Sequence, residues 1–486
     1  MEIIVLTLYF LALVVLFGYG MHALGMVYHY STMPPGNSEP ADVAGEDLPA
    51  VTVQLPIFNE LYVVERLIES VCGLDYPRDR LEIQVLDDST DETVSIASDL
   101  CRRKREQGFR IEHIHRKDRR GFKAGALRAG LERASGRFIA IFDADFLPNP
   151  DFLCRSVPHL LADPNLGLVQ GRWEHINIDY SLLTRIQAIA LDAHFVMEQQ
   201  VRNRWKLFMN FNGTAGIWRR STIEDAGNWQ ADTLTEDLDL SYRAQLRGWR
   251  FLYLNDLAVP AELPSEINGL KSQQFRWTKG AIETARKLLL PVWRAPLSLR
   301  VKLHATLHLT SNLVFPCILV VAMLNIPVLL IKQSNPDLGV VFDLMGVFVL
   351  GSIASLLFYM TAQRAVREDW SRRIVLIPLS LAGTMGMAVN NTRAVLQALF
   401  RRKSPFVRTP KFAITRVGDT WRGRRYALRS VRFDVLLETV MALYFIVAIG
   451  FSIHYVEVSL IPFQVMFLFG FGLTAALSIK HAWGSR

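Results

Sequence analysis

Long apolar runs occupy both ends of the chain and are missing from its middle. The first run covers residues 3–27, and the others follow at about 305–331, 340–362, 435–456 and 458–482. As helices, runs of this length cross the roughly 30 Å hydrocarbon core of a bilayer. We therefore expect an integral membrane protein with an N-terminal transmembrane helix over 1–29 and transmembrane or interfacial helices over 299–486.

A cleaved signal peptide is the alternative interpretation of the first run. Such a peptide begins with basic residues and has a shorter apolar centre, whereas the only early charge here is Glu2. The pattern favours a retained membrane span.

The middle region, residues 34–298, alternates short apolar runs with helical patterns. Strands are predicted at 51–55, 83–86 and 137–142, and helices at 60–71 and 92–107. Repetition of strand, loop and helix indicates an α/β domain with a parallel sheet, whose ligand lies at the carboxyl ends of the strands.

The position of the charged residues along the chain indicates how the membrane segments are oriented. The chain has 486 residues, is 50% hydrophobic and carries a net charge of +8. Residues 401–432 hold eleven basic side chains against one acid, so this stretch alone carries a formal +10. Basic loops beside spans stay in the cytosol, and 363–373 is a second such loop. Because both loops need the cytosol, we expect the apolar segment between them, 374–400, to be re-entrant or interfacial.

Acidic residues follow two of the predicted strands. Asp87 and Asp88 come after the strand at 83–86, and Asp143 and Asp145 come at the end of the next. Each pair has a structural interpretation, an N-cap for the first and a solvated turn for the second. Each also has a chemical one: the first pair can bind a nucleotide's base or ribose, and the second, together with substrate phosphates, can hold a divalent cation.

Two further motifs lie on predicted helices. The string TED at 235–237 opens a helical segment, where acids stabilise a helix N-terminus but where Asp237 could also act as a general base. Gln273, Arg276 and Trp277 share one helical face. An amide, a guanidinium and an indole together suit a diphosphate beside a sugar ring; the alternative is an interfacial Trp with a snorkelling Arg.

In this order, the four motifs resemble the Asp, DxD, TED and QxxRW series of processive family-2 glycosyltransferases. The order of membrane segments and motifs is similar to that of cellulose and hyaluronan synthases. The motif sequences themselves are closer to those of plant cellulose-synthase-like mannan and glucan synthases and their bacterial relatives. The resembling strings are QLPIFNE (54–60), QVLDDSTD (84–91), GFKAGAL (121–127), FDADF (142–146), FNGTAGIWRR (211–220), TEDLDLSYRA (235–244) and QQFRWTKG (273–280). The resemblance implies an α/β GT-A domain, a Rossmann-like mixed sheet over 34–298 that ends in the QxxRW helices, fused to an α-helical transmembrane bundle.

The resemblance also implies roles for the donor-side residues. Asp87 and Asp88 would contact the nucleotide, and Lys123 would hold its base or phosphate side. Asp143 and Asp145 would bind Mg²⁺ or Mn²⁺ bridging the diphosphate.

Further roles concern the chemical step and the acceptor. Asp237, with Glu236 beside it, would take the acceptor hydroxyl's proton, Arg276 and Gln273 would steady the diphosphate, and Trp277 would stack on the acceptor sugar. The segment implied to lie beside the acceptor terminus is FNGT, that is Phe211, Asn212, Gly213 and Thr214.

A gating-loop-like segment is expected at 404–416. The string FVRTPK at 406–411 resembles the FxVTxK loop that closes over the nucleotide, which makes Thr409 and Lys411 candidate donor ligands. Arg408 stands where the family has Val, and Pro410 stiffens the loop, so its motion need not match the family's.

The expected function is synthesis of a β-linked polysaccharide. A base on one side of the anomeric carbon and leaving-group stabilisation on the other predict inversion, so that an α-linked donor gives a β-linkage. The donor is either UDP-glucose or GDP-mannose. The growing glycan is expected to be exported across the membrane. Alternatives are a single-addition glycolipid (ceramide) glucosyltransferase and, outside enzymes, a membrane transporter or scaffold whose basic segment binds anionic lipid.

The remaining expectations concern location and partners. The catalytic domain should face the cytosol, at the inner membrane of a bacterium. A nucleic-acid partner is not expected despite a pI near 9.3, because the basic residues lie beside spans and no reading motif is present. The partners are therefore the nucleotide sugar, the nascent polysaccharide and the lipid membrane, and nothing in the sequence indicates a partner subunit.

Overall fold

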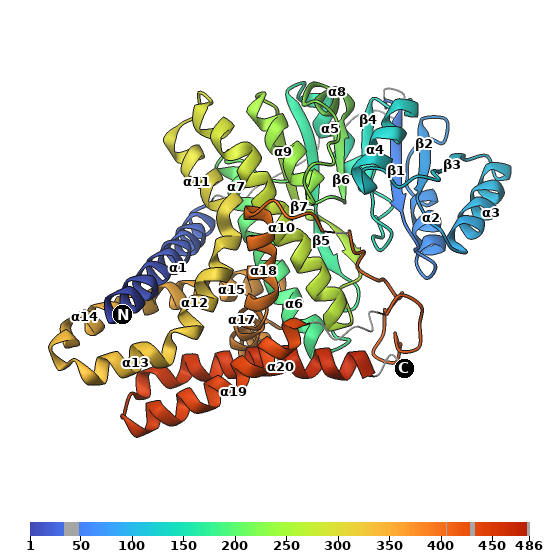
Figure 1. Ribbon diagram of the computed structural model, residues 1–486. Coiled ribbons are helices and arrows are strands. Elements are labelled where there is room, and N and C mark those ends of the chain that lie inside the picture. The colour runs from blue at the N-terminus through green and yellow to red at the C-terminus, as the bar shows by residue number, and fades with distance from the viewer. Residues whose placement is uncertain (34–47, 405, 428–432, 484–486) are drawn as a thin grey trace.

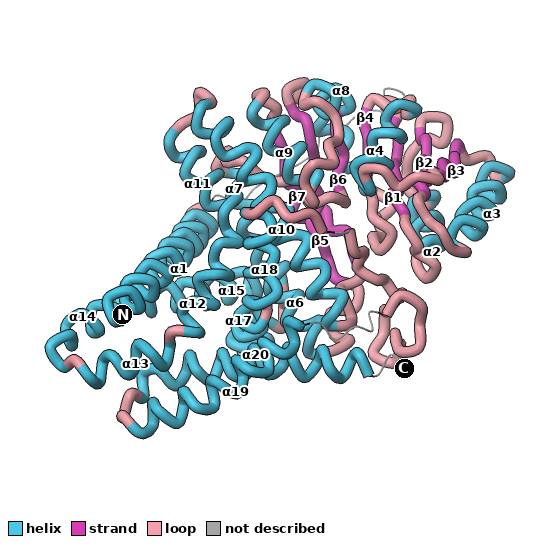
Figure 2. The backbone as a smooth tube through the Cα atoms, viewed as in Figure 1, coloured by secondary structure: helices cyan, strands magenta, loops and turns pink. Residues whose placement is uncertain are grey.

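The computed structural model describes residues 1–33, 48–404, 406–427 and 433–483. Its two halves differ in kind: the strands gather in an α/β domain, and the other half consists of helices alone (Figures 1 and 2). The N-terminal helix α1 (Glu2–Ser31) belongs to the helical half, although the α/β domain follows it in sequence.

A seven-stranded mixed sheet forms the centre of the α/β domain, in the order β3-β2-β1-β4-β6-β5-β7. Its strands are β1 (Val51–Ile57), β2 (Leu81–Asp87), β3 (Arg110–His115), β4 (Phe138–Ile141), β5 (Leu166–His175), β6 (Gly216–Arg219) and β7 (Arg250–Ala261). Strand β6 runs antiparallel to β4 and β5, whereas the other pairs are parallel. The predicted strands are confirmed, and the mixed sheet arises because the chain re-enters from the carboxyl edge after β5.

Helices cover the sheet in the manner that the sequence pattern predicts. In α2 (Val64–Cys72), the buried residues Val64, Leu67, Ile68 and Val71 recur at helical spacing and face the core. The other helices of this domain are α3 (Thr93–Glu106), α4 (Phe122–Arg133), α5 (Phe152–Ala162), α6 (Leu182–Asp192), the π-helix η2 (Ala193–Gln199), α7 (Gln200–Arg204), α8 (Arg220–Asp225) and α9 (Glu236–Leu246).

The helical half joins the domain through α10 (Ile267–Arg294), which packs on both α9 and α18. The helices of this half are α1, α11 (Leu299–Thr310), α12 (Val314–Met323), α13 (Asn325–Ser334), α14 (Gly339–Met345), α15 (Val349–Val366), α16 (Trp370–Arg373), α17 (Ile377–Gly386), α18 (Ala388–Leu399), α19 (Phe433–His454) and α20 (Ile461–Trp483). Glycines allow close packing here: a Cβ on Gly20 would lie 2.5 Å from the Cα of Gly351 on α15.

Five stretches of the described chain are long and apolar enough to cross a membrane, and they correspond to the predicted apolar runs. They are Glu2–Ser31, Leu299–Met323, Pro336–Val366, Phe433–His454 and Val458–Ala482. The segment expected to be re-entrant forms two helices that meet at an angle of 44°, which suits a broken span as well as a re-entrant loop.

Candidate active site

A cavity of about 200 Å³, here the strand-end cavity, lies at the carboxyl ends of β1 and β4. The basic segment that follows α18 passes over this edge of the sheet (Figure 1). Most of the predicted site residues line it: Asp88, Lys123, Asp143, Asp145, Asn212, Gly213, Glu236, Asp237, Gln273, Arg276, Trp277, Thr409 and Lys411. The structure thus brings together residues separated by more than 300 positions, in the place that the strand-end rule predicts.

Three predicted site residues lie behind the cavity wall. Asp87 is fully buried, and its carboxylate accepts hydrogen bonds from His113 Nε2 (2.8 Å) and the backbone N–H of Ser89 (2.7 Å). Burial raises the pKa of Asp87, but these bonds outweigh it and leave the pKa below its usual value. Phe211 packs in the core, and the Thr214 hydroxyl accepts a hydrogen bond from the backbone N–H of Asp143 (2.9 Å). Their positions suit support of the site rather than contact with substrate.

Both carboxylates of the DxD motif are paired with lysines. Lys123 Nζ donates to Asp143 and to the backbone carbonyl of Gly213 (2.9 Å). Lys411 Nζ, from the gating-loop-like segment, donates to Asp145 Oδ2 (2.6 Å). Burial raises the pKa of Asp143 even though Lys123 opposes the shift. The segment around Lys411 therefore reaches into the strand-end cavity and lies against the predicted cation ligands.

The donor set fits a hard divalent cation. The described residues contain no group of three His, Cys, Asp or Glu side chains placed to hold a metal by themselves. Asp143 and Asp145 both line the cavity, and a cation bound there would take the place of the ammonium groups of Lys123 and Lys411 beside them. Mg²⁺ binds in this way in many phosphate sites, through one or two carboxylates and the substrate's own phosphates.

Asp237 lies in the first turn of α9 and points into the cavity. Burial and the adjacent Glu236 carboxylate raise the pKa of Asp237 to about 7. Gly213 lies against it with a φ of +81°, and a Cβ there would be 2.9 Å from Asp237 Oδ2. A glycine is needed at this point both for the backbone conformation and for the close approach.

Residues of the QxxRW motif line the opposite wall from α10. Arg276 Nη2 donates to the Thr409 hydroxyl (3.1 Å), and its guanidinium lies 4.7 Å from the centre of the Phe406 ring. Trp277 borders Trp173, with 6.4 Å between ring centroids. Arg276 therefore contacts the gating-loop-like segment directly, and a ligand bound to Arg276 would lie beside this segment.

Several residues of the site were not singled out by the sequence patterns. Glu60 pairs with Arg408 (2.6 Å), and burial raises its pKa to about 7. Arg116 holds both oxygens of Asp88, at 2.7 and 2.6 Å, and the Arg119 guanidinium lies 3.3 Å from the centre of the Phe58 ring. The available signals were the position of Glu60 in the string QLPIFNE and the basic run just before GFKAG.

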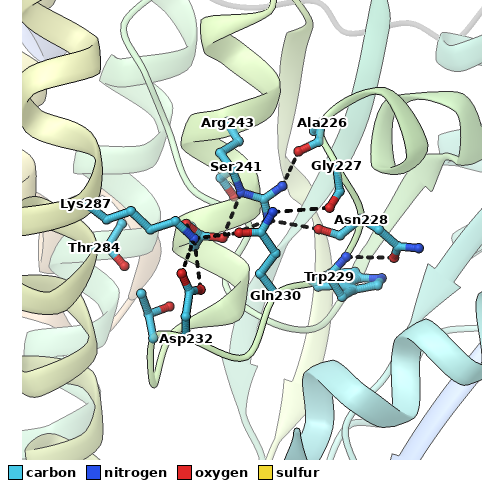
Figure 3. Close-up of polar contacts among 12 residues, drawn as sticks. Ala226, Gly227, Asn228, Trp229, Gln230, Asp232, Ser241, Arg243, Thr284 and Lys287 are labelled. Atoms are coloured by element: carbon cyan, nitrogen blue, oxygen red, sulfur yellow. Dashed lines mark hydrogen bonds and ion pairs between the residues drawn. The ribbon is translucent and has the colours of Figure 1, made fainter.

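A buried polar cluster fixes α9 against α10 (Figure 3). The Asp239 carboxylate, fully buried, accepts from Arg243 Nε (2.8 Å) and forms an ion pair with Lys287 Nζ (2.8 Å). Lys287 also donates to Asp232 (2.9 Å), and Arg243 donates to the backbone carbonyl of Asn228 (2.9 Å). Because Lys287 lies eleven residues, close to three whole turns, beyond Arg276, both face the TED segment.

A second cavity, of about 420 Å³, continues from Asp237 and Trp277 toward the helical half, and we name it the membrane-side cavity. Its lining combines apolar side chains with hydroxyls and amides from α12, α17, α18 and α20, among them Phe315, Ser380, Thr384, Asn391, Thr474 and Leu477. Such a mixture suits a sugar, which presents hydroxyls at its edge and C–H groups on its faces.

Asn212 lines both cavities and is oriented by a series of hydrogen bonds. Its Oδ1 accepts from Gln199 Nε2 (2.6 Å), and its Nδ2 lies 3.1 Å from His194 Nε2. The other ring nitrogen of His194 lies 2.9 Å from Glu198, which also accepts from Arg202 (2.9 Å). Burial raises the pKa of Glu198, but Arg202 and His194 outweigh it and hold the pKa well below its usual value. His194 and Glu198, which belong to this series of hydrogen bonds, lie in the π-helix, a distortion that is frequent at functional sites.

Comparison with known proteins agrees with this geometry. The family described as "Glycosyltransferase like family 2" matches residues 49–280. A glucomannan 4-beta-mannosyltransferase 1 of Cyamopsis tetragonoloba is 32% identical over 456 residues, which is 88% of this chain and 82% of the relative. The chain belongs to the cellulose synthase-like family-2 glycosyltransferases. Membership of an enzyme family disfavours the alternative of a non-catalytic transporter or scaffold.

Other similarities are shorter or more distant. Glucomannan 4-beta-mannosyltransferase 2 of Arabidopsis thaliana is 48% identical over 257 residues, 52% of this chain and 48% of the relative; the chain thus spans about half the length of several relatives that it matches. The mannosyltransferase PcManGT of Pyrobaculum calidifontis, solved in complex with GDP-Man and Mn²⁺, has a TM-score of 0.52, 20% identity, and coverage of 83% of this chain and 99% of that chain. This similarity confirms the GT-A-like fold. The two glucomannan 4-beta-mannosyltransferases are plant proteins, so they do not support the expected bacterial membrane.

Proposed function

We propose that this glycosyltransferase moves mannose from GDP-mannose to the end of a β-1,4-linked glycan. The observation that carries the proposal is that the two cavities meet at Asp237 and Trp277, which joins the predicted diphosphate site to a space between membrane helices. The names of the plant relatives favour mannose over the glucose that the sequence left open.

Donor binding uses charges already present in the strand-end cavity. Asp88, held by Arg116, would contact the nucleoside. Arg276, Lys123 and Lys411 line the same cavity and would surround the diphosphate. A divalent cation at Asp143 and Asp145 would supply further stabilisation of the leaving diphosphate's charge.

The transfer step needs one base and a stabilised leaving group. Asp237 would accept the proton of the acceptor hydroxyl while the acceptor oxygen forms the new bond to the anomeric carbon. The bond between the anomeric carbon and the diphosphate breaks at the same time, and Arg276 stabilises the negative charge on the departing diphosphate. Attack from the face opposite the leaving group inverts the configuration, so an α-linked donor gives a β-linkage. Asn212 and Trp277 would fix the acceptor sugar for this attack.

The membrane-side cavity would then receive the product. After each addition the glycan end moves away from Asp237, past Trp277, and into the cavity between α12, α17, α18 and α20. We propose that this path carries the polymer across the membrane, with the α/β domain in the cytosol as the positions of the basic loops favour.

A single addition to a lipid acceptor is the second candidate. The apolar side chains of the membrane-side cavity, such as Phe315 and Leu477, would suit a lipid tail, whereas its hydroxyls and amides and the names of the plant relatives favour a glycan.

Product analysis tests the proposal. Detergent-purified protein would be given radiolabelled GDP-mannose or UDP-glucose with Mn²⁺, and the products digested with endo-β-1,4-mannanase and with endo-β-1,4-glucanase. We expect a polymer from GDP-mannose that the mannanase degrades. A product with one sugar on a lipid, or incorporation from UDP-glucose alone, would contradict it.

A further inference from the structure

A third cavity adjoins the membrane-side cavity, with which it shares Leu183, Leu473 and Leu477. It has a volume of about 410 Å³ and lies where the start of α6, the segment after the gating-loop-like string and the last turns of α20 meet. We name it the basic cavity; the residues used below are Leu182, Leu477, Trp421, Arg422, Lys480 and His481.

The polar part of this cavity is positive. Arg422 and Lys480 supply its positive charge, whereas His481 is held neutral because its Nδ1 accepts a hydrogen bond from the backbone N–H of Ile267 (3.2 Å); no Asp or Glu is among the described residues that line the cavity. Within the described part of the chain, no ion pair engages Arg422 or Lys480. These cations repel one another, so an anion bound between them would lower the electrostatic energy.

The apolar part of the cavity lies at the level of a membrane surface. Lys480 and His481 are in the last turn of α20, within the candidate span Val458–Ala482. Leu477 lies one turn deeper, and Leu182 at the start of α6 is 42% exposed. Cations and an indole at the end of a span, above an apolar wall, match an amphiphile with an anionic head and hydrocarbon tails.

We propose that the basic cavity binds the headgroup of an anionic phospholipid. The phosphodiester would lie between Arg422 and Lys480, and an acyl chain would follow Leu477 along α20. A free phosphate shares the anionic chemistry but would make no use of the apolar wall.

The proposed lipid site adjoins the gating-loop-like segment. The Trp421 ring contacts His481 (4.9 Å between centroids) and lies 6.4 Å from Phe412. Phe412 follows Lys411, whose ammonium reaches Asp145. A lipid held at Arg422 would therefore keep this segment over the strand-end cavity. Only this consequence rests on the proposed function; binding itself does not.

Native mass spectrometry of the full chain tests the binding. The protein would be released from nanodiscs that contain equal amounts of phosphatidylglycerol and phosphatidylcholine. The double variant Arg422→Gln/Lys480→Gln would be compared with Arg401→Gln/Lys403→Gln, which removes the same charge from exposed residues of the same basic stretch outside the cavity. We expect wild type and control to retain phosphatidylglycerol preferentially, and the cavity variant to lose this preference by roughly ten-fold.

Other outcomes would overturn the proposal. Equal retention by the cavity variant would place the lipid elsewhere, and equal loss in both variants would show general attraction to the basic stretch. Displacement of the lipid by millimolar inorganic phosphate would indicate a free-anion site. Because Arg422 and Lys480 are exposed, both variants should fold; the single variant Arg422→Gln provides a milder change that must lower retention in the same direction.

The transferase assay separates this proposal from the proposed function. In nanodiscs of phosphatidylcholine with added phosphatidylglycerol, we expect the anionic lipid to lower the donor KM of wild type and of the control, but not that of the cavity variant. Loss of transfer in every protein and lipid would refute the proposed function and leave the retention result unaffected.

Discussion

The protonation state of Asp237 controls the proposed reaction at the level of single residues. Its carboxyl is buried beside Glu236, and its pKa is raised to about 7. A base must be ionised to accept a proton, so the protonated form that dominates below pH 7 is inactive.

A pH profile tests this assignment. We expect kcat/KM to rise with pH through a single acid limb with a midpoint near 7, because kcat/KM reports groups of the free enzyme. Glu60 has a similarly raised pKa, so the limb should persist in Glu60→Gln. A limb centred near pH 4, or one that disappears in Glu60→Gln, would show that another group is titrating.

Lys411 and the cation are predicted to compete for Asp145. Removing the ammonium in Lys411→Met leaves that carboxylate without its partner, so we expect Mn²⁺ to bind roughly ten-fold more tightly. The measurement is titration of free Mn²⁺ by electron paramagnetic resonance, which needs no turnover. Lys403→Met, an exposed position of the same basic stretch, is the control and should leave the affinity unchanged. Weaker binding in Lys411→Met would exclude competition.

At the level of elements, the reaction depends on the fit between α9 and α10. The first carries Asp237 and the second carries Arg276, and the Asp239–Lys287 pair joins them. Contact is close along the interface, since a Cβ on Gly280 would lie 2.5 Å from Thr235 Cγ2. The two groups that act on opposite sides of the anomeric carbon are therefore fixed by contacts outside the cavity.

Breaking this pair should misplace the base without removing it. For Lys287→Met we expect kcat to fall about ten- to a hundred-fold with little change in the donor KM, because a small displacement at the reacting atoms has such an effect. Lys287→Arg should restore most of the rate. Arg294→Met, exposed at the end of the same helix, is the control. A raised donor KM with an unchanged kcat would show that the pair acts on binding instead.

Part of this arrangement could be predicted from the sequence, and part depends on the tertiary fold. Strands and helices that follow one another locally, such as β1 and α2, were predictable from periodicity, and the motif residues at their ends were predictable from chemistry. The reversed direction of β6 depends on a long connection and left no local signal. Arg116 was missed because a basic run is usually solvated, and only the fold brings its guanidinium to Asp88. Phe211 belongs to a recognisable string, but its side chain turns into the core.

For the whole molecule, the proposed reaction requires that the α/β domain and the basic segment after α18 lie on one side of the membrane. We expect a cysteine placed at Val417, which is 71% exposed, to resist a membrane-impermeant maleimide in intact cells and to react once the membrane is opened. A cysteine at Asp337, exposed at the start of the candidate span Pro336–Val366 and so at the end opposite the basic loop 363–373, should react in intact cells. Labelling of both positions from outside would show that 374–400 crosses the membrane once.

The most direct test of the account is the isosteric substitution Asp237→Asn. The measurements are polymer formation from GDP-[¹⁴C]mannose and GDP-mannose affinity by calorimetry, on purified protein with Mn²⁺. We predict that transfer falls by about 10²- to 10⁴-fold while affinity changes little, and that Asp79→Asn, whose side chain is 80% exposed, behaves as wild type. Elongation by Asp237→Asn at the wild-type rate would contradict the assignment of Asp237 as the base.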